Sequence, residues 1–314
     1  MNNAVFSDRQ NSPDTEASRW LKGFDDHLSR VQGLAPRTRQ AYCGVVSRFL
    51  EGFCGTVAPD WSSLRSEHLT TFVRREASRL KRNARRTPAV AIRALLRYLK
   101  FDGAVGSGME AAVPRTPRWK LAALPPSLSA VQIERVIAHI ATDTPKGRRD
   151  RAILLLLARM GLRAVEIAQL TLDDIDWRSG RLWIRRCKSR RDRCLPLAQD
   201  VGDALCDYLE HGRQLCPSRL VFLRVLAPHS PLRNSAAVCK IARRALTRAG
   251  IVNTPAAAHL FRHASATRML TSGASFNEIA DVLGHISLKT TAIYAKLDLA
   301  ALSAVSLPWP GSRP

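Results

Sequence analysis

Apolar side chains recur with helical spacing through the first third of the chain. One predicted helical face holds Trp20, Phe24, Leu28 and Val31, and a second holds Tyr42, Val45, Val46, Phe49, Leu50 and Phe53. A third helix is expected from about residue 66 to residue 80. A fourth is expected to start at Thr87-Pro88, a cap followed by proline in the first turn, and to carry Ile92, Leu95, Leu96 and Leu99. These stripes predict a helical domain over residues 15–103, after a flexible amino terminus of residues 1–14.

Residues 104–126 lack helical spacing and are rich in glycine, proline and basic side chains, which is typical of a linker. A second domain is expected over residues 127–296, because Ser129-Ala130-Val131-Gln132 has the pattern of a helix-capping box. An apolar helix is predicted near residues 150–160, and it ends at Gly161. A short helix follows, with Glu166, Ile167 and Leu170.

The apolar period then changes from helical spacing to alternation, which is typical of strands. Ile175 and Trp177 precede the turn Arg178-Ser179-Gly180, and alternation returns in Leu182 and Ile184 and again in Leu195 and Leu197. The pattern predicts a small antiparallel sheet with a basic turn from Lys188 to Arg193. Further helices are expected near residues 198–212, 235–249, 259–272, 277–283 and 288–295, before a tail of residues 297–314. The predicted fold class is mainly α with a small antiparallel β-sheet (α+β).

The chain of 314 residues carries a formal net charge of +23, with a pI near 11.0 and 46% hydrophobic residues. This apolar fraction predicts a globular protein, and the excess of Lys and Arg predicts a polyanionic partner. Nucleic acid is favoured, because regularly spaced phosphates reward many separate cations through counterion release. An anionic membrane surface is the alternative. It is disfavoured because the basic residues are spread along the chain and not gathered beside one apolar face.

The amino terminus and the spacing of the cysteines bear on the cellular location. The first residues hold no apolar run, so no signal peptide is expected, and the longest apolar run, residues 152–158, is too short to span a bilayer. Seven cysteines without a Cys-x-x-Cys pair argue against a disulfide framework or a zinc site. We expect a cytoplasmic, nucleoid-associated bacterial protein.

The densest basic segment lies between residues 74 and 100, where Glu76 is the lone acidic residue. We predict contact with the DNA backbone rather than an ordinary solvated face, because like charges at this density repel unless a polyanion relieves them. The predicted contacts are Arg74, Arg75, Arg79, Lys81, Arg82, Arg85, Arg86 and Arg93, together with Arg186, Arg190 and Arg191 of the basic turn.

Reactive side chains follow one another near the carboxyl terminus: His259, Arg262, His285 and Tyr294. Arg163, just past Gly161, offers a second guanidinium. A guanidinium stays charged and holds two non-bridging phosphate oxygens, and a phenol can attack phosphorus once its proton is removed. The hypothesis is DNA strand cleavage, with Arg163 and Arg262 on the phosphate and Tyr294 as the nucleophile.

Other groups complete the predicted site. His259 and His285 can supply hydrogen bonds or shuttle protons. Glu166 is placed to orient Arg163 by a salt bridge, with some other arginine as the alternative partner. Lys188 is the predicted general acid for the leaving 5′-oxygen, because the arginines around it cannot easily release a proton. His263 is interpreted as a structural histidine, hydrogen-bonded in the core.

No metal and no cofactor are expected. The two arginines supply positive charge at the phosphate, and the sequence lacks a carboxylate cluster of the two-metal kind near these residues.

These motifs resemble those of the tyrosine recombinases of the phage-integrase family, which includes the Xer recombinases and many transposon integrases. Residues 161–167 resemble the first-arginine motif, and residues 187–197 resemble the lysine hairpin, with Ser189 where glycine is common. His259-Leu260-Phe261-Arg262-His263 resembles the His-x-x-Arg-His motif, with Phe261 where leucine is usual. Leu283-Gly284-His285 and Tyr294 match the final histidine and the nucleophile, and the preceding helical segment resembles the family's core-binding (SAM-like) domain.

The resemblance implies a site-specific recombinase that forms a 3′-phosphotyrosyl link and frees a 5′-hydroxyl, which attacks the partner strand to give a Holliday junction. It implies double-stranded DNA with paired sites, a homotetramer on two sites, a monomer or weak dimer without DNA, no cofactor, and a tail that docks on a neighbouring subunit. A type IB topoisomerase, which shares the chemistry, and a non-catalytic DNA-binding protein are the alternatives.

Overall fold

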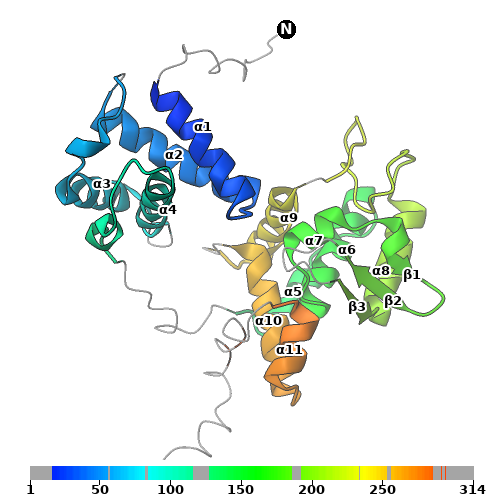
Figure 1. The fold of residues 1–314 in the computed structure, drawn as a ribbon. Helices are drawn as coiled ribbons and strands as arrows, with labels where there is room; N and C mark the ends of the chain where they lie inside the picture. The colour runs from blue at the N-terminus through cyan, green and yellow to red at the C-terminus, as the bar shows by residue number, and fades with distance from the viewer. Residues whose placement is uncertain are drawn as a thin grey trace, which may run out of the picture. The chain divides into compact units, whose positions relative to one another are not determined.

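A computed structural model describes residues 16–55, 57–81, 84–115, 127–185, 192–232, 234–252 and 256–285, together with Thr291 and Tyr294. Its contacts divide the chain into two compact units, Met1–Trp119 and Lys120–Pro314. The described residues are mostly helical, and a three-stranded antiparallel sheet lies in the second unit (Figure 1). The predicted fold class, mainly α with a small antiparallel sheet, is confirmed.

The helices of the first unit are α1 (Glu16–Arg30), α2 (Pro36–Phe53), α3 (Ser66–Arg79) and α4 (Thr87–Phe101), with the short 3₁₀ helices η1 (Trp61–Ser63) and η2 (Met109–Ala112). The inner helix is α4, which contacts α1, α2 and α3. Its apolar stripe is buried, including Ile92, Leu95 and Leu99. The predicted stripes therefore form the core of this unit, because each helix turns its apolar face toward α4.

The first unit departs from the sequence prediction at two helix ends. Helix α1 ends at Arg30 and the chain turns at residues 31–32, so Val31 lies outside the helix and is 64% exposed. Thr87 is the first helical residue rather than the cap, because its N–H already bonds to the carbonyl of Ala84 at 2.9 Å. Arg86 occupies the cap position, and Pro88 fits the first turn, where its missing N–H leaves no helical bond unmade.

The second unit is built around one buried helix, α6 (Pro145–Arg159), in which residues 152–158 are all buried. It contacts α5 (Ala130–Ala138), α7 (Ala164–Gln169), α8 (Gln199–His211), α9 (Ser235–Arg248) and α10 (Ala257–Thr271) (Figure 1). An apolar run without a polar face is expected of a helix that others surround. Helix α6 begins before the predicted residue 150, because Thr144 caps it by accepting the N–H of Gly147 at 3.1 Å.

Local signals placed several other elements of the second unit. The capping box before α5 is confirmed: Ser129 Oγ accepts the N–H of Gln132 at 3.2 Å, and the Gln132 side chain accepts the N–H of Ser129 at 2.9 Å. Helix α11 (Phe276–Leu283) packs on α10, and the short 3₁₀ helix η3 (Leu172–Asp174) leads into the sheet. The predicted helix near residues 288–295 lies outside the described residues, apart from Thr291 and Tyr294.

The sheet has the order β1 (Ile175–Asp176), β2 (Arg181–Ile184), β3 (Arg193–Pro196), and both pairs are antiparallel. Leu182 pairs with Leu195, and both are buried. Trp177 follows β1 in the turn and is 45% exposed, so it does not belong to the predicted strand. Arg193 was expected in the basic turn but pairs with Ile184 as the first residue of β3. Residues 186–191, with Lys188 among them, lie outside the described residues.

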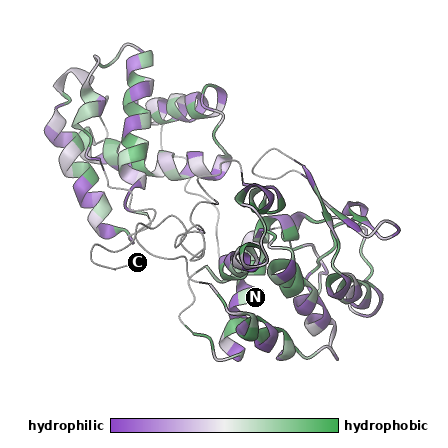
Figure 2. Ribbon diagram, turned by 90° about the horizontal axis from the view of Figure 1, so that it is seen from below, coloured by the Kyte–Doolittle hydropathy of each residue, from purple (hydrophilic) through white to green (hydrophobic). Residues whose placement is uncertain are grey.

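Each unit has its own hydrophobic core, and the helices of both units carry hydrophobic and hydrophilic residues together (Figure 2). A smaller apolar cluster lies under α10 and α11 and consists of Ala266, Ile279, Leu283 and Tyr294. The ring of Tyr294 is therefore fixed by packing against α10 and α11.

Candidate active site

Among the described residues of the second unit, Arg262 on α10 is the most deeply buried basic residue, at 5% exposed. Its Nη1 donates to the carbonyl of Gly161 at 2.6 Å, and its Nη2 donates to the carbonyl of Leu283. Gly161 has φ +62°, and a Cβ there would come within 2.7 Å of Leu283 Cδ2, so glycine is required. The guanidinium therefore ties the end of α6 to the end of α11.

Arg262 remains a cation at neutral pH. Burial and the charge of Arg163 lower the pKa of Arg262 to about 9, although Glu166 acts in the opposite direction. A buried guanidinium whose hydrogen bonds go to carbonyls keeps its positive charge without a paired carboxylate. That charge is available to an anion that enters the site.

Arg163 is the N-cap residue of α7, four residues after the end of α6. Its Nη1 donates to Glu166 Oε1 at 2.8 Å, its Nη2 donates to the carbonyl of Gly284 at 2.8 Å, and its backbone N–H donates to Glu166 Oε2 at 2.8 Å. The expected salt bridge between Glu166 and Arg163 is thus present. Glu166 fixes both the backbone and the side chain of Arg163.

Arg193 shares the same carboxylate, with Nη2 at 2.8 Å from Glu166 Oε2. Burial raises the pKa of Glu166, but the hydrogen bonds and charges of Arg193 and Arg163 outweigh it and lower the pKa to about 2. Sequence reasoning missed Arg193 as a site residue because it counted it in the basic turn. Alternation could have found it, since Arg193 and the buried Leu195 lie on the same face of β3.

The hydroxyl of Tyr294 contacts His263. Tyr294 is 1% exposed, and its hydroxyl oxygen lies 2.6 Å from His263 Nδ1, with the rings in a T-shaped arrangement at 5.6 Å. The interpretation of His263 as a structural histidine of the core is thus incomplete, because its partner is the predicted nucleophile.

The other two histidines lie beside this pair. His285 Nδ1 lies 2.8 Å from Thr291 Oγ1. His259 is on the exposed side of α10, with its ring 6.5 Å from the ring of His263. The structure therefore places Arg163, His259, Arg262, His285 and Tyr294 in one region, and Lys188 lies outside the described residues.

The acid–base groups of the site are shifted toward their neutral forms. Burial, His259 and Arg262 lower the pKa of His263 to about 4, and burial, Arg262 and Arg163 lower that of His285 to about 4. The same three causes lower the pKa of His259. Burial raises the pKa of Tyr294 to about 12, against the charge of Arg262. At neutral pH the phenol thus keeps its proton, and His263 and His285 can accept one.

The predicted DNA-contact residues of the first unit fall into two groups. Arg93 is partly buried and donates Nη2 to the carbonyl of Val113 at 2.7 Å and to that of Pro114 at 3.1 Å, so it holds the chain after η2. Arg79 pairs with the buried Glu76. The exposed residues are Arg74, Arg75, Arg79, Lys81, Arg85 and Arg86, whereas Arg82 and the hairpin residues Arg186, Arg190 and Arg191 lie outside the described residues.

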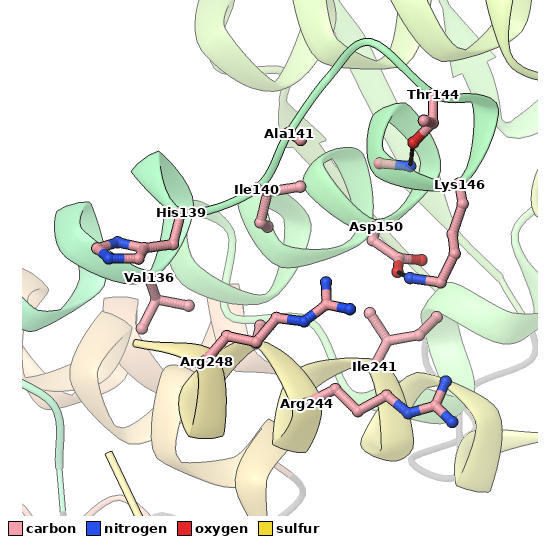
Figure 3. A pocket seen from close by; sticks show the side chains of 12 residues that line it. Val136, His139, Ile140, Ala141, Thr144, Lys146, Asp150, Ile241, Arg244 and Arg248 are labelled. Atoms are coloured by element: carbon pink, nitrogen blue, oxygen red, sulfur yellow. Dashed lines mark hydrogen bonds and ion pairs between the residues drawn. The ribbon is translucent and has the colours of Figure 1, made fainter. Parts of the chain in front are cut away.

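A separate cavity of about 190 Å³ lies between α5, the start of α6 and α9 (Figure 3). Lys146 and Asp150 form an ion pair at 2.8 Å on one side, and Arg244 and Arg248 line the other. None of its lining residues belongs to the group around Arg262.

Among the described residues, no helix is long and apolar enough to cross a membrane.

Comparison with known proteins places the chain in a family. Residues 126–300 match the model of the phage integrase family, and residues 21–103 match that of the phage integrase N-terminal SAM-like domain. The chain belongs to the phage integrase family. It is a tyrosine recombinase, and the enzymes of this family cleave and rejoin DNA strands.

Two of the relatives that match most of the chain indicate its activity. The protein y4rA of Sinorhizobium fredii, named as an integrase/recombinase, is 40% identical over 291 residues, which are 93% of this chain and 71% of its own length. The tyrosine recombinase XerA of Pyrococcus furiosus is 31% identical over 283 residues, which are 90% and 91% of the two chains. These relatives support a recombinase and not the topoisomerase alternative.

Two of the solved structures that share the fold are complexes with DNA. The XerH site-specific recombinase bound to the palindromic difH substrate aligns with a TM-score of 0.72 at 19% identity, over 95% of this chain and 90% of its own. A dimer of λ integrase residues 75–356 bound to a COC′ core site aligns with a TM-score of 0.69 at 15% identity, over 94% and 99% of the two chains.

Proposed function

We propose that Arg163 and Arg262 hold the scissile phosphate of a DNA strand while Tyr294 attacks it. The oxygen of Tyr294 bonds to phosphorus, the bond to the 5′-oxygen breaks, and the products are a 3′-phosphotyrosyl link and a 5′-hydroxyl. The observation that carries this proposal is the position of Arg262, which is buried beside Arg163 and close enough to Tyr294 to shift its pKa. Two fixed cations beside a phenol match the charge that develops in such a transition state.

The remaining groups receive supporting roles. Glu166 fixes the direction of the Arg163 guanidinium, because it accepts hydrogen bonds from both the backbone and the side chain. His259 and His285 are proposed to donate hydrogen bonds to the phosphate oxygens. Lys188 is proposed to protonate the leaving 5′-oxygen, which an arginine cannot easily do.

The proposed substrate is double-stranded DNA with paired recombination sites, bound by a homotetramer that passes through a Holliday junction. The complexes of XerH with difH and of λ integrase with its core site support DNA as the partner. The exposed basic residues of α3 and of the segment before α4 are proposed to contact the DNA backbone. In a bacterial cell this would associate the protein with the nucleoid. The domain bounds 15–103 and 127–296, the linker and the docking tail of residues 297–314 stay predictions.

A nicked suicide duplex tests the cleavage. The Tyr294→Phe protein first selects a binding site from a library of random duplexes, and the selected site is then rebuilt with a nick beside the cleavage position. The unmodified protein should form a covalent adduct, and Tyr294→Phe should form none. Tyr208→Phe is the control, because Tyr208 is a buried tyrosine of the same unit whose hydroxyl accepts the N–H of Leu223.

Each other result is decisive. No adduct from the unmodified protein on a site that it binds would leave the non-catalytic DNA-binding alternative. An adduct with Tyr294→Phe would place the nucleophile elsewhere. Recombinant products from a plasmid with two sites would separate recombination from relaxation of supercoils.

A further inference from the structure

Among the described residues, His263 Nδ1 is the hydrogen-bond partner of the Tyr294 hydroxyl, at 2.6 Å. His263 lies one helical turn after His259 on α10, so both rings point to the same side of the helix. His285, the third imidazole, bonds to Thr291 instead. Of these three histidines, His263 is therefore the one already in contact with the proton that must leave.

We propose that His263 is the general base of the strand-cleavage step and accepts the phenolic proton of Tyr294 on Nδ1. This inference rests on the proposed role of Tyr294 as nucleophile. As the Tyr294 oxygen bonds to phosphorus, its proton passes to His263, and the 5′-oxygen leaves and takes a proton from a different donor. In rejoining, the 5′-hydroxyl attacks and gives its proton back to that other donor, the phenol leaves phosphorus, and His263 returns the proton to the phenol.

Geometry and charge fit an acceptor at Nδ1. A general base must lie within hydrogen-bond reach of the proton, and the observed contact meets this requirement in the DNA-free protein. The lowered pKa of His263 keeps its imidazole neutral at pH 7, so a ring nitrogen has a free lone pair. The raised pKa of Tyr294 means that the phenol does not ionise without help.

The surroundings explain how a weak base can take this proton. The charged and titratable groups around the pair are His259 and Arg262 on α10, Arg163 and Glu166 at α7, Arg193 on β3 and His285 after α11. In the DNA-free protein the positive charges disfavour a second cation on His263. A bound phosphate adds negative charge beside them, which offsets this repulsion and raises the affinity of His263 for the proton.

The first test needs no DNA. In the unmodified full-length protein, ¹⁵N NMR of the histidine side chains reports which ring nitrogen carries hydrogen. We expect Nδ1 of His263 to be unprotonated at pH 7, with hydrogen on Nε2. A protonated Nδ1 would overturn the proposal, because that nitrogen could not accept from Tyr294.

The second test uses the nicked duplex under single-turnover conditions, with the protein saturating. His263→Asn keeps an oxygen acceptor near the position of Nδ1 but cannot take a proton, so cleavage should slow about 10²-fold or more while the affinity for DNA is unchanged. His139→Asn is the matched control, because His139 is an exposed histidine of the same unit with its own Nδ1 contact at 2.7 Å. Cleavage by His263→Asn at the control rate would refute the proposal.

The pH dependence separates a base from a merely structural residue. Cleavage by the unmodified protein should be nearly flat between about pH 6 and 8, because His263 is neutral there and Arg262, with a pKa of about 9, is still charged. In His263→Asn the rate should climb about tenfold per pH unit, because the phenol must then lose its proton to hydroxide. A slower variant with a flat profile would identify a structural role instead.

A 5′-bridging phosphorothiolate distinguishes the two ends of the reaction, since a thiolate leaves without a proton. It should not restore cleavage by His263→Asn, and restoration would place His263 on the leaving-group side. If the unmodified protein formed no adduct at all, the proposed function would fail before this inference was reached. An adduct together with a wild-type rate in His263→Asn would refute the inference alone.

Discussion

Replacing Glu166 by Gln tests how strongly one buried carboxylate stabilises the active site. Glu166 accepts four hydrogen bonds from Arg163 and Arg193, and its side chain is 2% exposed. The fall of its pKa from 4.5 to about 2 corresponds to about 3 kcal/mol of stability at pH 7. Glutamine removes the charge and leaves two guanidinium groups facing each other, so Glu166→Gln should cost about 3 kcal/mol.

Calorimetry of the full-length protein measures this cost. For a unit of this size, about 1 kcal/mol moves the melting temperature by about 2–4 °C, so the transition of the second unit should fall by about 6–12 °C. The control is Glu134→Gln, which weakens an ion pair with Arg159 whose carboxylate is 57% exposed. An exposed pair contributes at most about 1 kcal/mol, so the control should shift the transition by no more than about 4 °C.

The pH dependence of the difference has a fixed sign. The pKa of Glu166 is lower in the folded protein than in the unfolded chain, so its contribution is complete above about pH 5 and is lost as the pH falls toward 2. At pH 3 the gap between the unmodified protein and Glu166→Gln should shrink to about half or less of its value at pH 7. Equal melting shifts for the two variants at pH 7, or a gap independent of pH, would refute the assignment of this stability to the Glu166 carboxylate.

Three further substitutions test other parts of the structure. Arg262→Lys should abolish adduct formation on the nicked duplex. One ammonium group cannot replace a guanidinium that bonds to two carbonyls and also faces the phosphate. Adduct formation at the wild-type rate would contradict this prediction. Gly284→Ala should lower the melting temperature of the second unit by about 2–8 °C, since φ is +61° and a Cβ would meet Arg193 Nη1 at 2.6 Å; an unchanged melting temperature would contradict it. Replacing Arg74 and Arg75 together by Ala should weaken DNA binding and reduce the slope of log affinity against log salt by about 1–2, measured by fluorescence anisotropy; an unchanged slope would show that neither contacts phosphate.

Local signals in the sequence were sufficient for much of the fold. The capping box at Ser129 placed the start of α5, and the alternation of Leu182 and Ile184 placed β2. These features depend on residues close together in the chain, where period and capping chemistry act directly. The prediction that Val31 belongs to the first helix was wrong, because apolar spacing does not show where a helix ends. The chain turns after Arg30.

The residues of the candidate site were also apparent as motifs, but apart from the pair of Glu166 with Arg163 their partners were not. Arg262 bonds to the backbone carbonyls of Gly161 and Leu283. Every residue has such a carbonyl, so the sequence does not indicate which ones a side chain will bond to. His263 and Tyr294 meet across 31 positions of sequence, a contact that only the packing of α10 against the following segment creates. The sequence thus suggested candidate reactive groups, and the fold determined which of them are in contact.

The two carbonyls that hold Arg262 lie at the carboxyl ends of helices. Gly161 follows the last turn of α6, and Leu283 closes α11. Carbonyls in such positions have no partner inside their helix and carry part of its negative dipole, which suits a buried cation. If the last turn of α11 frayed, the buried guanidinium of Arg262 would lose its hydrogen bond to the carbonyl of Leu283. The amide hydrogens of this turn should exchange only with the cooperative opening of the whole unit, so a protein with Arg262 half released would be a rare species.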